Sequence, residues 1–563
     1  MKMHDEHPTS TADDRHSAAL AWRIAALTGL LFVGCVVVDL AASNQRRPFG
    51  YQASDAYYYL TVARHAVEDG KLAFDGEHST NGFHPLWQWT LVPLTLGARM
   101  LHAPPHRLLL AIVIVQALLV AAALVLLVLA LARDRVALPL APLLPLGAYG
   151  ALAIPVWWHA FGTIAHGPRS PVEPLSGTLW SYVNGMESPL VLLTFAWAVW
   201  LWLARDPVKR PRDAALLGGA LSLLTLARLD HVLFALPILA RLWLDRRAAT
   251  QAGDARSRNA WWFAAVIFGV PVATYAVYNW IAFGSPMPVS GGLKSSFPHV
   301  NHANLDRLWA SVAHLPKQNY WRLLRIEQLV IPMLFAIVFL VTTQLRRRAT
   351  RLDHLLAAVA LGVLLLGAYD LLFVDLTLHG SWYLPISTLF PSLLLLRALG
   401  SWRPGLRVTV AIVVGGALVV VAGFVKLHRY VRAGENYAHF YFDVAPRVRA
   451  HYGDTPPRIL ENDDGIVSFA TGFRAMAGMG LTLDPEGARA WSSGQIVPLA
   501  VARDYHYITS TAYWPIVPSI SASDAQVRAF LLNHLFVPNA ERFSYAVDYS
   551  NQNFAIIRVE PRK

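Results

Sequence analysis

The chain has 563 residues, of which 55% are hydrophobic and only 15% charged, whereas about a quarter of the residues are charged in ordinary soluble domains. Apolar runs at 108–132 and 406–427 exceed the ~18–20 residues that cross the hydrocarbon core of a bilayer. This composition excludes a disordered chain and a coiled coil, and a single cysteine, Cys35, excludes an internal disulfide framework. We therefore expect a polytopic α-helical membrane protein.

About eleven segments have the length and hydropathy of membrane spans. The first, at 18–42, is not followed by a signal-peptide cleavage site, so we expect it to be retained. The others are expected near 105–132, 136–158, 187–204, 213–227, 230–244, 260–283, 327–344, 353–375, 382–399 and 406–426. The apolar segment 84–100 is short, and we expect a half-helix at the outer interface, with Trp87 and Trp89 at the level of the lipid headgroups.

The net charge of +12 is distributed unevenly between these segments. Most arginines and lysines between the spans lie in five alternate loops, near 133–135, 205–212, 241–258, 346–351 and 397–407. Lys and Arg collect on the cytoplasmic side of a membrane, so we expect a cytoplasmic amino terminus and, with an odd number of spans, an extracytoplasmic carboxyl terminus. The basic surplus is thus a topology signal, and we expect membrane lipid and no nucleic acid as partner.

Two domains are expected. Residues 1–428 form a transmembrane domain with a first external loop at 43–104, and residues 429–563 form an extracytoplasmic soluble α/β domain. In the second domain, turn residues occur at 454–457, 463–465 and 484–487. Strands are expected at 458–460, 505–509 and 554–559, and a helix at 524–535.

Polar side chains that the spans do not explain gather at the predicted outer face. They lie in six short segments, at 54–59, 79–87, 184–189, 228–231, 284–294 and 379–383. In such a cavity a carboxylate can deprotonate a hydroxyl, cations can hold a phosphate, and aromatic rings can pack on a sugar or prenyl group. This combination suits glycosyl transfer from a lipid phosphate. The chain has no HExxH or CxxC spacing and no Gly-rich nucleotide loop, so soluble nucleotide chemistry is unsupported. We expect no cofactor, and dependence on a divalent metal stays open at the level of sequence.

The acidic candidates also have purely structural interpretations. Asp55 could cap the amphipathic helix that follows it, because Asp accepts hydrogen bonds from first-turn amides. Glu187 could stabilise the start of a span through the helix dipole. Arg228 and Asp230 could form an ion pair where two short apolar segments turn near the bilayer.

The remaining candidates have structural alternatives as well. Lys294 could be a solvated or snorkelling side chain in a Gly-rich external loop. His84 could serve the turn before Pro85. Trp382 and Tyr383 could belong to a belt of aromatic residues at the membrane surface.

Several short motifs resemble, in chain order, the bacterial GT-C superfamily of membrane glycosyltransferases that use polyprenyl-phosphate sugars. They are Asp55-Ala-Tyr-Tyr-Tyr-Leu with Arg64, Phe74-Asp-Gly, Thr80-Asn-Gly-Phe-His-Pro-Leu-Trp87, Gly185-Met-Glu-Ser188, Ala227-Arg-Leu-Asp230, and 279–294 with its Phe-Gly-Ser-Pro-Met-Pro core. Residues 462–466 and their surroundings resemble the extracytoplasmic domain with which these proteins tend to end. Members of the group often have two consecutive acids before Ala-Tyr, whereas here the first is Ser54, which weakens any role that needs paired carboxylates, including metal binding.

This resemblance implies an inverting, multi-spanning transferase at the outer face of a bacterial inner membrane. A sugar would move from a polyprenyl-phosphate donor to the hydroxyl of a glycan, lipid or protein acceptor. Asp55 would be the catalytic base, with Glu187 a second acidic residue at the cavity and the donor phosphate near Arg228 or Lys294. The substrate-binding residues would be Tyr58, Tyr59, Asn81, His84, Arg228, Asp230, Lys294, Trp382 and Tyr383.

Three other functions remain open at the level of sequence. A polysaccharide polymerase or lipid-linked ligase would share the outer face and many spans, and longer products would identify it. A transporter or flippase of lipid-linked sugars would favour discontinuous helices at the midplane and internal repeats, which the chain lacks. A binding module on a membrane anchor would need neither eleven spans nor acids at the outer face.

Overall fold

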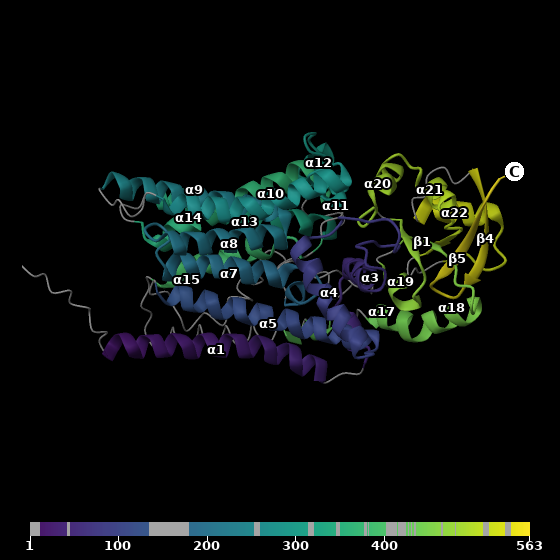
Figure 1. Ribbon diagram of the computed structural model, residues 1–563, viewed down its shortest axis with the longest axis horizontal. Coiled ribbons are helices and arrows are strands. Elements are labelled where there is room, and N and C mark those ends of the chain that lie inside the picture. Colours follow the sequence, from purple (N-terminus) through teal and green to yellow (C-terminus); the bar gives the residue numbers. More distant parts are fainter. Residues whose placement is uncertain are drawn as a thin grey trace, which may run out of the picture.

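The computed structural model describes residues 12–41, 45–133, 179–252, 259–313, 320–344, 349–376, 380 and 382–400, and then 414, 424–425, 427–429, 431–432, 435–462, 465–478, 480–510, 517–534 and 542–562. Long helices lie side by side in an elongated bundle, and a smaller domain with a β-sheet lies at one end of it (Figure 1). The span expected at 136–158 and most of the one at 406–426 lie outside the described residues.

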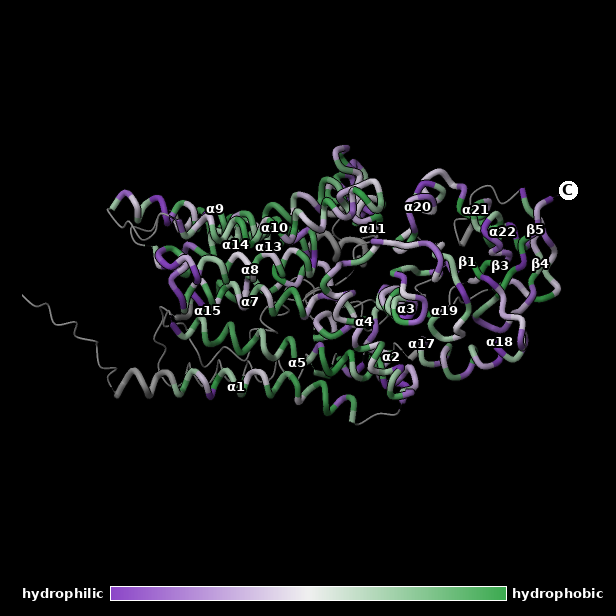
Figure 2. Tube along the Cα trace, viewed as in Figure 1, coloured by the Kyte–Doolittle hydropathy of each residue, from purple (hydrophilic) through white to green (hydrophobic). Residues whose placement is uncertain are grey.

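The bundle confirms a helix at each of the other predicted spans. Its members are α1 (Ala12–Ala41), α5 (Pro105–Ala132), α7 (Ser188–Ala204), α8 (Pro211–Ala227), α9 (Val232–Gln251), α10 (Ala260–Phe283), α13 (Tyr320–Gln344), α14 (Arg351–Phe373) and α15 (Pro385–Gly400). Figure 2 shows mostly hydrophobic residues along α5, whereas hydrophilic residues are frequent in the smaller domain.

Four helices of the described residues are long and apolar enough to cross a membrane. They comprise Ala19–Ala41 of α1, Pro105–Ala132, Ala260–Phe283 and Arg351–Phe373. Shorter apolar helices occur at Ser188–Ala204, Gln328–Thr343 and Pro385–Ala398. The structure therefore supports a membrane protein with several spans, and the number eleven stays a prediction.

Local sequence signals explain where several of these helices begin and end. Proline occupies the first turn of α5, α7 and α8, where its fixed φ suits a helix and its missing N–H is not needed. Thr350 and Asp353 form a capping box at the start of α14. Gly284 ends α10 in the left-handed conformation, with φ of 74°.

Further helices lie at the end of the bundle near the smaller domain, where Figure 1 labels α3, α4, α11 and α12. They are α2 (Arg47–Tyr51), α3 (Ser54–Glu68), α4 (Pro85–Met100), η2 (Trp180–Tyr182), η3 (Leu229–His231), α11 (Val289–Lys294) and α12 (His302–Ala313). The helix expected at 84–100 is present as α4. The interface role expected of Trp87 is wrong, because its side chain is fully buried and donates a hydrogen bond to the carbonyl of Gly185, whereas Trp89 is 59% exposed.

The smaller domain is built on a five-stranded sheet with strand order β2-β1-β3-β5-β4. The strands β1 (Ile459–Glu461), β2 (Ala475–Ala477) and β3 (Tyr507–Thr509) are parallel, and β4 (Phe543–Ser550) and β5 (Ala555–Pro561) pair antiparallel. The strands expected at 458–460, 505–509 and 554–559 are confirmed. The strands β2 and β4 were not expected.

Helices surround this sheet. They are α17 (Glu435–His439), the π-helical turn η6 (Phe440–Val444), α18 (Ala445–Tyr452), α19 (Ile466–Thr471), α20 (Pro485–Ser492), α21 (Ile496–Ala502) and α22 (Asp524–His534). The helix expected at 524–535 is confirmed by α22. The turn expected at 484–487 is instead the start of α20, because the Asp484 carboxylate accepts from the backbone amides of Glu486 and Gly487.

Candidate active site

Charged and aromatic side chains from distant parts of the sequence meet where α3, α4, α7, η3 and α11 approach one another. We call this set the polar cluster. It consists of Asp55, Tyr59, His84, Glu187, Arg228, Asp230, His231, Lys294 and Tyr383. Eight of the eleven residues expected to form the site from sequence therefore lie together.

Asp55 lies in the first turn of α3. The residue before the helix is Ala53, and no side chain caps this end, so the interpretation of Asp55 as a helix cap is wrong. Oδ2 of Asp55 lies 3.8 Å from Nζ of Lys294, and the Asp55 side chain is 18% exposed. The carboxylate is thus held close to a cation and remains accessible.

Lys294 is the last residue of the short helix α11. Its ammonium group donates a hydrogen bond to the Tyr383 hydroxyl and lies 5.1 Å from the centre of that ring. Burial alone would lower the pKa of Lys294, but Tyr383 and Asp55 raise it overall, so this side chain is charged at neutral pH. A merely solvated lysine does not fit these contacts, because the side chain is 15% exposed.

Arg228 lies at the centre of the buried half of the polar cluster. One of its nitrogens is 2.5 Å from Oε1 of Glu187, and Nε donates to both carboxylate oxygens of Asp230 at 3.1 and 3.0 Å. The predicted Arg228–Asp230 ion pair is confirmed, and Glu187 belongs to the same network. Glu187 is completely buried, and although it directly precedes α7 its side chain caps no amide of that helix.

Tyr383 joins the two halves of the polar cluster. The guanidinium carbon of Arg228 lies 4.1 Å from the centre of its ring, and Lys294 contacts both the ring and the hydroxyl. Trp382 packs edge-on against Tyr383, and its carbonyl accepts a hydrogen bond from Oγ of Ser188. Both aromatic side chains are buried, so the interpretation as a belt at the membrane surface is wrong.

Two histidines complete the polar cluster. Nε2 of His84 lies 3.6 Å from Oε1 of Glu187, and the backbone N–H of His84 donates to the Tyr59 hydroxyl. Burial lowers the pKa of His84 to about 3, with the charge of Arg228 acting in the same direction, so this ring is uncharged at neutral pH. The expected turn role is present as well, because His84 directly precedes α4.

His231 was not expected to be a site residue. Its Nδ1 lies 2.6 Å from Oδ1 of Asp230, and the ring is completely buried. The signal that could have identified it is its position in the same short motif as Arg228 and Asp230.

Tyr58 and Asn81 pack against the loops around the polar cluster. Tyr58 is buried edge-on against Phe74, with ring centres 5.3 Å apart. The Asn81 side chain donates to Asn279 and accepts from the backbone N–H of Val289, the first residue of α11. Both residues therefore support the loops that carry the polar cluster.

A polar residue inside α5 holds the turn before Glu187. The Gln116 side chain donates to the carbonyl of Met186 at 2.7 Å and accepts from the N–H of Gly185 at 2.9 Å. Asn184 in turn accepts from the N–H of Ala53 through its carbonyl, so the same turn also fixes the start of α3. The signal for Gln116 was its place as a polar residue within a long apolar run.

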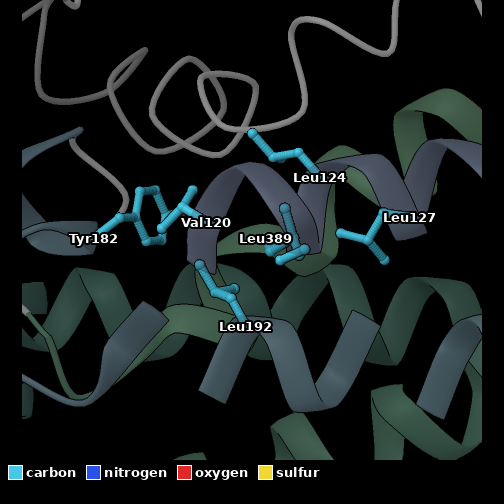
Figure 3. A pocket seen from close by; sticks show the side chains of 7 residues that line it. Val120, Leu124, Leu127, Tyr182, Leu192 and Leu389 are labelled. Atoms are coloured by element: carbon cyan, nitrogen blue, oxygen red, sulfur yellow. The ribbon is translucent and has the colours of Figure 1, made fainter. Parts of the chain in front are cut away.

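An apolar pocket lies further along the helices that support the polar cluster (Figure 3). Its lining residues come from α5, η2, α7 and α15, and they are Val120, Ala123, Leu124, Leu127, Tyr182, Leu192 and Leu389. Leu192 lies five residues beyond Glu187 on the same chain segment, which corresponds to an advance of about 7 Å along a helix. The charged groups are thus followed by an apolar site deeper in the bundle.

The residues that the structure describes include no group of three or more His, Cys, Asp and Glu side chains arranged to hold a metal ion. The polar cluster is made up of paired positive and negative side chains.

Comparisons with known proteins give one point of reference. No protein-family model matches the chain, and no curated protein sequence matches it. Among solved structures, the chain is similar to the crystal structure of ArnT from Cupriavidus metallidurans bound to undecaprenyl phosphate, with a TM-score of 0.47 and 11% sequence identity, over 93% of this chain and 97% of that chain.

Proposed function

We propose that the chain is a glycosyltransferase that moves a sugar from a polyprenyl-phosphate donor to an acceptor hydroxyl at the outer face of a bacterial inner membrane. The observation that carries the proposal is the accessible pair of Asp55 and Lys294. Their carboxylate and ammonium groups lie 3.8 Å apart beside a buried arginine that is paired with two carboxylates. The motifs that contain both residues resemble those of GT-C enzymes, and the proposal takes its donor class from that resemblance.

In the proposed reaction, Asp55 accepts the proton of the acceptor hydroxyl. The acceptor oxygen then forms a bond to the anomeric carbon of the donor, and the bond between that carbon and the phosphate oxygen breaks. The configuration at the carbon is inverted, and the polyprenyl phosphate leaves with the bonding electron pair. Lys294 stabilises the charge that develops on the phosphate.

We assign the donor phosphate to Lys294 rather than Arg228. Arg228 is 5% exposed and is already neutralised by two carboxylates, those of Glu187 and Asp230. A phosphate that approached it would meet negative charge on both sides. Lys294 is more accessible and has a single carboxylate neighbour within 4 Å among the described residues, namely Asp55.

Glu187 then has a different role from the one expected from sequence. Its side chain is completely buried and contacts Arg228, so we assign it as a positioning residue that acts through Arg228 and Tyr383.

The test is turnover of purified protein with a polyprenyl-phosphate sugar, after the lipid that copurifies has been identified by mass spectrometry. Asp55→Asn should lower turnover by a factor of about 10² to 10⁴, because it removes the base and keeps the shape of the side chain. Asp69→Asn is the matched control, since Asp69 follows the other end of α3 and pairs with His65. Unchanged turnover in a folded Asp55→Asn variant would sink the proposed mechanism.

Product length separates the proposed function from its nearest competitor. A transferase of this kind adds one sugar to each acceptor, whereas a polymerase makes a ladder of products and a transporter makes none. Mass spectrometry of the acceptor after a single-enzyme incubation distinguishes the three.

A further inference from the structure

The smaller domain, at the carboxyl-terminal end of the chain, contacts both helices that carry the accessible pair, α3 with Asp55 and α11 with Lys294. We propose that this domain sets the separation of Asp55 and Lys294. In this proposal Gly465 and Ser468 position α3, and the segment 480–483 positions α11. The inference depends on the proposed function for its catalytic meaning, but the positioning itself is a statement about geometry.

The first contact is between α19 and α3. Gly465, which directly precedes α19, lies so close to α3 that a Cβ added to it would be 2.9 Å from both the backbone carbon of Tyr57 and the backbone nitrogen of Tyr58. The Ser468 carbonyl accepts from Arg64 at 3.1 Å, and its hydroxyl lies 3.4 Å from that of Thr61. These contacts reach α3 from Tyr57, soon after Asp55, to Arg64, about two helical turns further along.

A buried carboxylate fixes α19 to the sheet. Glu461, the last residue of β1, is completely buried, and its two carboxylate oxygens accept from the backbone amides of Val467 and Ser468 at 2.8 and 3.1 Å. Because these are charge-assisted bonds to the first turn of α19, the helix cannot shift against β1 without exposing or breaking them. Through α19, the position of α3 is thus fixed relative to the sheet of the domain.

The second contact is between the segment 480–483 and the first external loop. The carbonyl of Leu483 accepts from Oγ1 of Thr80 at 2.9 Å. Gly82 approaches the carbonyl oxygen of Leu481 so closely that an added Cβ would lie 1.8 Å from it. Only a glycine fits at this position while the backbones keep their distance.

The same segment also reaches α11. A Cβ added to Gly480 would lie 3.1 Å from a side-chain methyl of Leu293, the neighbour of Lys294. At the other end of α11, the N–H of Val289 donates to the side chain of Asn81, which lies between Thr80 and Gly82. The domain itself therefore contacts one end of α11 through Gly480. The other end is held by Asn81, whose neighbours Thr80 and Gly82 contact the domain.

The two contacts together explain how the accessible pair is kept apart but close. At 3.8 Å, Asp55 and Lys294 are beyond hydrogen-bond distance, so no direct bond between them fixes the gap. Each is instead held through its own helix by the same domain. The proposal thus makes the domain part of the catalytic geometry rather than a separate binding module.

A pair of glycine substitutions tests this. Gly465→Ala and Gly472→Ala change residues at the two ends of α19, and both residues have positive φ, of 78° and 76°. An added Cβ meets α3 at Gly465 but has nothing within 4 Å at Gly472. Backbone strain is therefore matched, and only the first substitution pushes on α3. We expect Gly465→Ala to lower kcat at least about tenfold with KM little changed, because misplacement of reacting groups acts on the chemical step, and Gly472→Ala to leave kcat within about twofold.

A second readout does not need activity. In full-length protein carrying Cys35→Ser, Asp55→Cys and Lys294→Cys, we expect Gly465→Ala to slow cross-linking by a short bismaleimide, whereas Gly472→Ala should not. Thr80→Val, which removes the hydrogen bond to Leu483, is the milder variant if Gly465→Ala does not fold, and it should slow cross-linking as well.

The outcomes separate the two proposals. Equal cross-linking rates in the Gly465→Ala, Thr80→Val and Gly472→Ala backgrounds would overturn the positioning role. Slower cross-linking in the first two, together with a wild-type protein that transfers no sugar, would support the positioning role and overturn the proposed function.

Discussion

The two halves of the polar cluster solve different physical problems. Around Arg228 the contacts are short, from 2.5 to 3.1 Å, and the guanidinium and Glu187 are almost completely removed from solvent. Between Asp55 and Lys294 the gap is 3.8 Å, and both side chains keep some exposure. In the first half the arginine is paired with two carboxylates, whereas the second half is a more loosely spaced pair that can take up a ligand.

This difference indicates which charges hold the site together and which can respond to a substrate. Burying a charge costs several kcal/mol unless it is paired and hydrogen-bonded, so Arg228, Glu187 and Asp230 must stay together once the helices have packed. Asp55 and Lys294 are more exposed than Arg228 and Glu187, and they can exchange contacts when a phosphate and a hydroxyl arrive. Substitutions in the two halves should therefore fail in different ways.

Arg228→Met should produce the largest effect, and on folding. It leaves Glu187 and Asp230 without their cation, and breaking a buried pair in this way costs about 3–5 kcal/mol. We expect a large fall in the thermal unfolding midpoint of the protein in detergent, and a low folded yield by gel filtration. The matched control is Arg241→Met, which removes a more exposed arginine paired with Asp245. Similar stability for these two variants would mean that Arg228 is not the structural centre of the cluster.

Lys294→Met should do the opposite, with a large effect on turnover and a small one on stability. Removing one group that stabilises developing negative charge typically lowers kcat by a factor of about 10² to 10³. Asp55 is left without its cation but remains accessible to water, so we expect the unfolding midpoint to change little. Turnover with a polyprenyl-phosphate sugar and thermal unfolding of the same preparation measure both quantities. A variant that unfolds as readily as Arg228→Met would remove the distinction between the two halves.

Sequence alone singled out both residues of the accessible pair for a physical reason, and their roles stay predictions. Asp55 and Lys294 lie in polar segments that interrupt an apolar chain. A charge in such a segment stands out, because placing it in or near a bilayer costs free energy unless it is paired or functional. The parallel strands β1 and β3 and the antiparallel β5 were also predicted, because short β-branched or aromatic runs between turns are a local signal. The strand β2, Ala-Met-Ala, has no such signal, since its burial comes from its neighbours in the sheet.

The errors in the sequence prediction concern packing between distant segments. Trp87 was assigned to the membrane surface, and a belt at that surface was the structural alternative for Trp382 and Tyr383, because aromatic residues often lie there. All three side chains are buried. Glu187 was expected to face the cavity, and only the approach of η3 shows that Arg228 covers it. Such contacts depend on the tertiary arrangement of helices, which periodicity does not encode.

The pH dependence of stability should reveal how strongly His84 is buried. An unfolded histidine titrates near 6.5, whereas burial lowers the pKa of folded His84 to about 3. Between these values the unfolded chain holds the proton and the folded chain does not, so the free energy of unfolding falls as the pH falls below 6.5. The slope is up to about 1.4 kcal/mol per pH unit, or about 2–3 kcal/mol between pH 6.5 and 4.5. His84→Gln should flatten this slope in denaturant titrations, and an equal slope in both proteins would contradict the assignment.

Tyr383→Phe should have the smallest effect and tests how the two halves are joined. The substitution keeps the ring that contacts Arg228 at 4.1 Å and removes the hydroxyl that accepts from Lys294. A hydrogen bond to a charged group contributes about 1.5 kcal/mol, so we expect roughly a tenfold rise in KM for the donor and nearly unchanged stability. Tyr383→Leu removes the ring as well, and it should therefore also lower the unfolding midpoint, because Arg228 loses its aromatic contact. If Tyr383→Phe and Tyr383→Leu lower the unfolding midpoint equally, the contact between the ring and Arg228 does not contribute to stability.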